Sequence, residues 1–179
     1  ASPVIREARL ARRLAAVAYE AVLFAALILV AGFLTVPLVP AAPSGGTALR
    51  IPDLPARVLS FAVVFAAGSF YYVWSWSGGR RTLPMKTWRL RLVRADGAPP
   101  DGRTALLRYL AVWIGPAMAL LAYLALRRWG LGAHGVWLVA LNFLWALIDP
   151  DRRFLHDRIA GTRIVSDAAS PPVNSAAQD

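Results

Sequence analysis

Residues 14–39 read LAAVAYEAVLFAALILVAGFLTVPLV and are apolar except for Tyr19, Glu20 and Thr35. An α-helix rises about 1.5 Å per residue, so about 20 such residues cross the ~30 Å hydrocarbon core of a bilayer. The run is also longer than the roughly 7 to 15 apolar residues at the centre of a signal peptide. We therefore expect an uncleaved helix that spans a membrane.

The rest of the chain continues this pattern. Of its 179 residues 58% are hydrophobic and 17% are charged, whereas soluble domains are about 45–50% apolar. Three more apolar runs cover residues 56–77, 109–126 and 131–148, and the last two leave open whether they form full spans or a partial hairpin. The sequence predicts an all-α membrane protein, a four-span helix bundle in one domain (residues 1–165), with a connector at residues 40–55 and a polar tail at residues 166–179.

The distribution of positive charge favours four spans with both termini in the cytoplasm. In this topology sixteen of the twenty Lys and Arg residues lie inside, and those outside are Arg50, Arg57, Arg127 and Arg128. Cytoplasmic loops of membrane proteins carry such an excess of Lys and Arg. A three-span topology would instead place the four C-terminal arginines on the translocated side.

Topology also accounts for the net charge of +10, so we expect no nucleic-acid partner. A basic segment beside the membrane gains about 1 kcal/mol per Lys or Arg from an anionic leaflet. The expected partner of the basic face is thus anionic lipid headgroups, with an acidic protein as the alternative. The residues of this basic cytoplasmic face are Arg80, Arg81, Lys86, Arg89, Arg91, Arg94, Arg152, Arg153 and Arg158.

Two short segments predict a small module at the inner membrane surface. Residues 88–93 alternate apolar and basic side chains before an Asp96-Gly97 turn, and residues 162–165 also favour a strand. We expect the two strands to pair and to bury Trp88, Leu90 and Leu92 toward the bilayer.

A short amphipathic helix should precede the second strand and lie flat on the membrane. Asp151 is the expected N-terminal cap and Gly161 the C-terminal stop. The apolar stripe of this helix consists of Phe154, Leu155 and Ile159.

Glu20 is the one acidic residue within an apolar run, seven residues after Arg13. A carboxylate there costs several kcal/mol unless it is protonated, paired or hydrated, so it marks a candidate functional site. Helical side chains lean toward the N-terminus, which makes Arg13 a poor direct partner. Two readings follow: an ion pair with an arginine of a neighbouring element, or the handling of ions or protons.

The fourth apolar run carries Asn142 and, at its inner end, Asp149. Asn142 is expected to form an interhelical hydrogen bond. Asp149 opposes the helix dipole and needs a cation, with Arg13, Arg152, Arg153 or the arginines of the loop at residues 78–108 as candidates. Glu20 and Asp149 would then share one cluster of charges near the inner face. Pro116 should kink the third span and leave one carbonyl without its helical partner.

Residue types exclude much enzyme chemistry. The chain has no cysteine, and its two histidines, His134 and His156, are predicted on opposite sides of the membrane, where they cannot share a metal. No Ser/His/acid arrangement is evident. We expect no catalytic residues, metal or cofactor, and we interpret His156 and Asp157 as a polar helix face beside Arg153 and Arg158.

Three segments together resemble the RDD family of bacterial membrane proteins, over about residues 9–165. They are Arg13 with Glu20, residues 79–93 (GRRTLPMKTWRLRLV) and residues 149–163 (DPDRRFLHDRIAGTR). The resemblance implies that the Arg and two Asp of the family name correspond to Arg13, Glu20 and Asp149, with Asp157 as the other candidate for the second Asp. Glutamate at position 20 departs from that pattern by one methylene.

The resemblance further implies a bacterial inner-membrane protein from a family in which most members lack an assigned activity and ion or small-solute transport is proposed for some. The first functional hypothesis is a non-enzymatic accessory subunit that packs against a membrane assembly or its own copies. The second is an ion or small-solute transporter that uses Glu20 and Asp149 as a proton or cation relay. A membrane enzyme is the third and would need a pocket containing Glu20, His156 or Asp157.

Overall fold

The computed structural model describes residues 8–35 and 54–166. The end of the first predicted span, most of the predicted connector and the tail from residue 167 lie outside these residues. The elements, in order, are α1 (Leu10–Thr35), α2 (Leu54–Trp76), α3 (Leu83–Thr87), β1 (Leu90–Arg94), α4 (Gly102–Val112), α5 (Ile114–Leu126), η2 (Arg127–Trp129), η3 (Gly132–Ala140), α6 (Leu141–Leu144), η4 (Trp145–Leu147), α7 (Leu155–Ile159) and β2 (Thr162–Ser166).

The described chain is mostly helical and carries the helices of a membrane protein. Three of its helices are long and apolar enough to cross a bilayer: Leu10–Leu34, Leu54–Trp76 and Gly102–Trp129. The fourth predicted span corresponds to a shorter apolar segment, Gly132–Leu147. This segment differs from the expected regular α-helix because η3 and η4 are 3₁₀-helices, with α6 between them.

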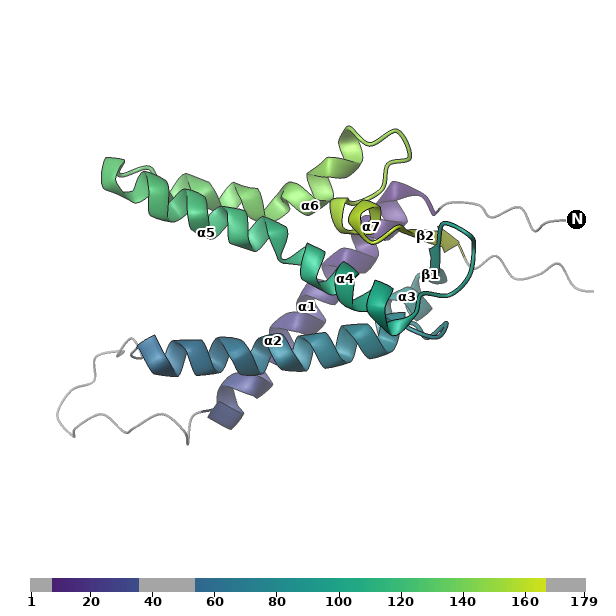
Figure 1. The fold of residues 1–179 in the computed structure, drawn as a ribbon, viewed down its shortest axis with the longest axis horizontal. Helices are drawn as coiled ribbons and strands as arrows, with labels where there is room; N and C mark the ends of the chain where they lie inside the picture. Colours follow the sequence, from purple (N-terminus) through teal and green to yellow (C-terminus); the bar gives the residue numbers. More distant parts are fainter. Residues whose placement is uncertain (1–7, 36–53, 167–179) are drawn as a thin grey trace, which may run out of the picture.

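The helices meet at one end of the molecule and diverge at the other (Figure 1). α2 packs against α1 and α4, while α5 packs against η3 as a separate hairpin. At the end where the helices meet, the backbone N–H of Ala8 donates to the carbonyl of Ile164 at 3.3 Å, and Arg12 donates to Ser166 at 3.1 Å. The start of α1 and the C-terminal strand therefore lie together at this end, which we call the strand end.

The two predicted strands pair there in an antiparallel ladder, with Leu92 opposite Ile164. Leu90 and Leu92 are buried, but residues of α1, α2 and α4 at the strand end cover them within the core. Trp88 is 39% exposed, so the expectation that it is buried with them was wrong. Arg89 has a φ of 51°, and this left-handed residue breaks the alternation between Trp88 and the strand.

The helix before β2 is shorter than predicted. Phe154, not Asp151, occupies the N-cap of α7, and Gly161 with a φ of 63° follows its C-terminal end. Ile159 is 42% exposed, whereas His156 and Asp157 are buried. The expected polar face of α7 thus points inward, because α4 supplies charged partners for it.

Pro116 separates α4 from α5. Because proline has no N–H, it cannot bond the carbonyl four residues earlier, which belongs to Val112. The helix breaks at Trp113, and Asn142 Nδ2 donates to the Val112 carbonyl oxygen at 2.7 Å. Asn142 therefore satisfies the carbonyl that Pro116 frees and links the fourth apolar segment to the third.

Glycines allow the backbones of α5 and η3 to touch. A Cβ atom on Gly115 would lie 2.7 Å from the carbonyl oxygen of Val139, and one on Gly135 would lie 2.9 Å from that of Ala119. Backbone atoms cannot yield as the end of a flexible side chain can. The hairpin consequently depends on these residues having no side chain.

We predict that Gly115→Ala lowers the free energy of unfolding by about 1–3 kcal/mol, because the added methyl overpacks a backbone contact. Gly102→Ala is the matched control, since a Cβ there meets nothing within 4 Å. Its effect should stay within about 0.5 kcal/mol. Unfolding in detergent micelles measures both changes, and equal stability of the two variants would contradict the close packing.

Candidate functional site

A cavity of about 310 Å³ lies where α1, α2, α4 and α5 come together near the strand end. Its size is at the lower end of the range of small-molecule pockets, about 300–1,000 Å³. Most of its lining is apolar or aromatic. Four ionisable side chains other than tyrosines also line it: Arg13, Glu20, Arg108 and His156.

Glu20 is held by a hydroxyl group. Thr82 Oγ1 donates to Glu20 Oε1 at 2.7 Å and accepts from the backbone N–H of Met85 at 3.3 Å. Thr82 is the N-cap of α3, and Pro84 lies in the first turn, which fixes the hydroxyl at the helix start. Among the described residues, the hydrogen-bond partner of Glu20 is thus Thr82. One of the two expectations for Glu20 had been an ion pair with an arginine.

Arg108 and Asp157 form a buried ion pair between α4 and α7. Arg108 Nε lies 2.8 Å from Asp157 Oδ1, and the two side chains are 4% and 0% exposed. Thr162 donates to the same carboxylate oxygen at 3.1 Å, and the Arg108 guanidinium lies 4.0 Å from the ring centroid of Trp76. This network joins α2, α4, α7 and β2 around one charge pair.

The protonation states of Asp157 and the neighbouring His156 follow from their surroundings. Burial opposes ionisation of Asp157, but the nearby positive charges of Arg108 and Arg13 and the hydrogen bond from Arg108 act together against it and hold the pKa of Asp157 below its ordinary value. Burial lowers the pKa of His156 to about 3, reinforced by the charge of Arg108 and opposed by Asp157. His156 is therefore neutral, and its Nε2 accepts from Arg108 at 3.2 Å.

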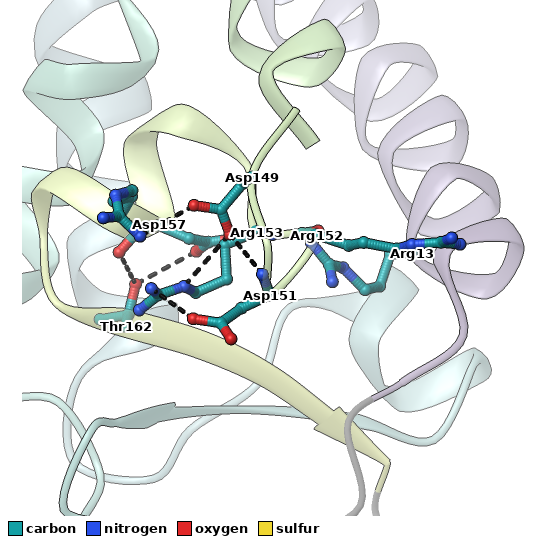
Figure 2. A network of polar contacts seen from close by, with 8 residues as sticks. Arg13, Asp149, Asp151, Arg152, Arg153, Asp157 and Thr162 are labelled. Atoms are coloured by element: carbon teal, nitrogen blue, oxygen red, sulfur yellow. Dashed lines mark hydrogen bonds and ion pairs between the residues drawn. The ribbon is translucent and has the colours of Figure 1, made fainter. Parts of the chain in front are cut away.

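Asp149 organises the loop after the fourth apolar segment (Figure 2). Its Oδ2 accepts the backbone N–H groups of Asp151 and Arg153, and its Oδ1 pairs with Arg158 at 2.9 Å. Arg158 was not among the predicted partners. Asp149 does not line the cavity that Glu20 lines; instead the N–H groups and arginines of its own segment compensate this carboxylate.

Arg13 connects α1 to the same loop. Its guanidinium donates to the carbonyl of Arg152 at 2.8 Å (Figure 2). The same guanidinium lies 4.6 Å from the ring centroid of Phe154. The side chain is 3% exposed. Arg13 thus serves as a tie between the first helix and the C-terminal segment.

The residues of the predicted basic face have two different roles. Arg80 donates to the carbonyl of Trp74 at 2.6 Å and closes the C-terminal end of α2. Arg153 and Arg158 pair with Asp149. Three other side chains extend outward at the strand end, namely Lys86, Arg89 and Arg91.

Sequence reasoning overlooked Thr82 and treated Arg108 as an ordinary loop arginine. Thr82 precedes Leu83-Pro84, a pattern typical of a helix start. Arg108 directly precedes the third apolar run, and Asp101 as N-cap starts the helix early enough to include it. Neither signal reveals the partner, since Glu20 and Asp157 are 62 and 49 residues away.

The sequence model of the RDD family matches residues 7–161. The chain belongs to the RDD family. The RDD match includes Arg13, Glu20, Asp149 and Asp157 and confirms the family predicted from the sequence motifs. No curated protein and no solved structure matches this RDD chain. Over the described residues, the RDD fold brings together no group of three or more His, Asp or Glu side chains that could hold a metal ion.

We predict that acid destabilises the protein through His156. A histidine in the unfolded chain takes up a proton near its ordinary pKa of about 6.5, whereas folded His156 stays neutral until about pH 3. The unfolded state thus binds more protons between these values, and stability falls as the pH is lowered through this window. Thermal unfolding in detergent from pH 7 to pH 4 measures the slope.

His156→Gln should flatten this pH dependence while keeping an acceptor for Arg108. His134→Gln is the control, since His134 is exposed. An unchanged slope in His156→Gln would show that another group causes the acid sensitivity.

Proposed function

We propose that this RDD protein is a non-enzymatic membrane protein that binds a small solute in the cavity and carries it across the membrane. The cavity does contain Glu20 and His156, which the enzyme hypothesis required. We favour transport because Arg108 occupies the Nε2 atom of His156, which would have to act as the base. The observation that supports the proposal is the placement of Glu20. It lines the cavity, and its hydrogen-bond partner among the described residues is the neutral hydroxyl of Thr82.

The energetics of buried charge favour a functional role for this carboxylate. An acid within a membrane span costs several kcal/mol unless it is neutral, paired or hydrated, and such residues mark solute or proton pathways. One hydroxyl offsets only part of that cost. Arg108 is paired with Asp157 and Arg13 is bonded to the loop. Glu20 is thus the acidic side chain at the cavity that a bound solute would complement.

The proposal replaces the relay of Glu20 and Asp149. Asp149 accepts two backbone N–H groups and pairs with Arg158, so protonating it would disturb the loop. In our proposal Glu20 alone contacts the solute or proton. Asp149 and Arg13 maintain the strand end, against which the cavity forms.

The topology that belongs to this proposal has four crossings in the bacterial inner membrane, with both termini in the cytoplasm. A 3₁₀-helix rises about 2.0 Å per residue, so Gly132–Leu147 reaches about 30 Å instead of about 24 Å as a continuous α-helix. That length suits a hydrocarbon core of about 30 Å. The contact of Ala8 with Ile164 also supports placing both ends on one side.

Reporter fusions test this topology. A green fluorescent protein fused after Asp179 should be fluorescent in cells, and alkaline phosphatase inserted after Gly130 should be active, because it is active only outside the cytoplasm. Insertion of the phosphatase after Gly97 is the control and should be inactive. A fluorescent protein that stays dark at the C-terminus, together with an active phosphatase there, would contradict four crossings.

Flux through reconstituted vesicles tests the transport proposal. We expect vesicles that contain the protein and a pH-sensitive dye to show proton flux when sodium, potassium or choline chloride is added outside. Glu20→Gln should reduce the flux at least tenfold, since it removes the charge while keeping an acceptor for Thr82. Asp96→Asn is the matched control, because Asp96 is exposed and paired with Arg94 at the surface.

A second pair of variants tests whether flux depends on the volume of the cavity, independently of the Glu20 carboxylate. Ala16 lines the cavity, so Ala16→Leu should fill part of it and lower the flux. Ala62→Leu makes the same change on an exposed position of α2 and should leave the flux unchanged. Flux that survives both Glu20→Gln and Ala16→Leu would contradict transport through this cavity.

An accessory subunit or homo-oligomer is the second candidate function. The observation in its favour is that the α5–η3 hairpin diverges from α1 and α2 (Figure 1). Large apolar side chains are exposed on these helices, including Phe33, Phe70 and Trp137. Lipid or a neighbouring chain must cover them in the membrane. Absence of flux with the native sequence, together with a stable oligomer in mild detergent, would favour this candidate.

A further inference from the structure

Aromatic side chains form a continuous wall of the cavity. The centroid distances are 6.2 Å between Phe24 and Tyr72, 6.1 Å between Tyr72 and Tyr109, and 6.2 Å between Tyr109 and Trp113. Trp76 joins this wall at 4.8 Å from Tyr72. All five residues line the cavity. Such rings present negative faces that attract cations, with tryptophan the strongest.

One ring of the wall contacts a positively charged side chain of the protein itself. The guanidinium carbon of Arg108 lies 4.0 Å from the centroid of Trp76. This distance is within the ~6 Å over which a ring attracts a cation. The contact between Arg108 and Trp76 thus shows that a ring of this wall can hold a cation.

The partners of the side chains around the cavity leave Glu20 as the acidic group that a cationic ligand would complement. Arg108 is neutralised by Asp157, and His156 is uncharged. Arg13 lies over Phe154 and donates to a carbonyl of the loop. Glu20, by contrast, accepts a bond from a neutral hydroxyl. A carboxylate beside several aromatic rings is the combination that recognises a quaternary ammonium group.

We infer that the cavity binds an organic cation with an apolar body, of the quaternary ammonium class, with its charged group between Glu20 and the faces of the aromatic wall. This inference rests on the proposed function and names the chemical class of the solute. A metal cation such as Ca²⁺ or Mg²⁺ fits less well, because it takes six or more oxygen ligands. The acidic side chain in this lining is Glu20, accompanied mainly by rings and aliphatic groups.

Phenyltrimethylammonium and tert-butylbenzene test the inference, because they have the same shape and differ in charge. Binding is measured by isothermal titration calorimetry with the full chain in lipid nanodiscs, and empty nanodiscs serve as the blank. We expect phenyltrimethylammonium to bind the native protein at least tenfold more tightly than Glu20→Gln. The neutral compound should bind both proteins equally, which corrects for its partition into lipid.

A second variant tests the aromatic wall independently of Glu20. Trp113→Leu should weaken binding of phenyltrimethylammonium about fivefold, and Trp137→Leu, at a position 74% exposed, should not change it. Thermal unfolding checks that each variant is folded. If Glu20→Gln does not fold, the comparison of Trp113→Leu with Trp137→Leu still decides the outcome.

Three results would overturn the inference. One is equal affinity of the native protein and Glu20→Gln for phenyltrimethylammonium, and another is the absence of binding. The third is tighter binding of the anion benzenesulfonate than of the cation, which would assign the cavity to Arg13 and Arg108. None of these decides the transport proposal, which depends on the flux measurement with sodium, potassium or choline chloride.

Discussion

The buried ion pair between Arg108 and Asp157 is the interaction on which the rest of the structure depends. Two charges removed from water are stable only when they are paired and hydrogen-bonded, and loss of one partner leaves the other uncompensated. Trp76 covers the guanidinium and Thr162 bonds the carboxylate. The pair therefore fixes the ends of α2 and α4 at the strand end to α7 and β2, and these elements form much of the cavity's boundary.

A second constraint is the close packing of α5 against η3, which contribute Pro116 and Val139 to the cavity lining. Gly115 and Gly135 let α5 and η3 approach until their backbones touch, and Asn142 bonds the carbonyl that Pro116 frees. The hairpin thus has a fixed internal geometry and joins α4 at the break near Trp113. The cavity lies beside this break, with Val112, Trp113 and Pro116 in its lining.

The polar residues of this RDD protein have two roles: some hold the strand end together, and one faces the cavity. Arg13, Asp149 and Asp157 are held in contacts that maintain the strand end. Glu20 faces the cavity and is bonded to Thr82. Every buried charge needs compensation, and among the described residues the acid that lines the cavity, Glu20, has a neutral hydroxyl as its hydrogen-bond partner. That difference supports a solute site at Glu20 over a shared relay with Asp149.

The sequence by itself determined the membrane class, the RDD family and the approximate places of the apolar helical segments and of the two strands. Apolar run length, the Asp96-Gly97 turn, Gly161 and Pro116 are local signals, and local signals depend on neighbours along the chain. Only the tertiary structure decided that His156 and Asp157 are buried, that Arg158 compensates Asp149 and that Thr82 bonds Glu20. Partners such as Arg108 and Asp157, 49 residues apart, are chosen by packing in space, for which the spacing of residues along one chain carries no signal.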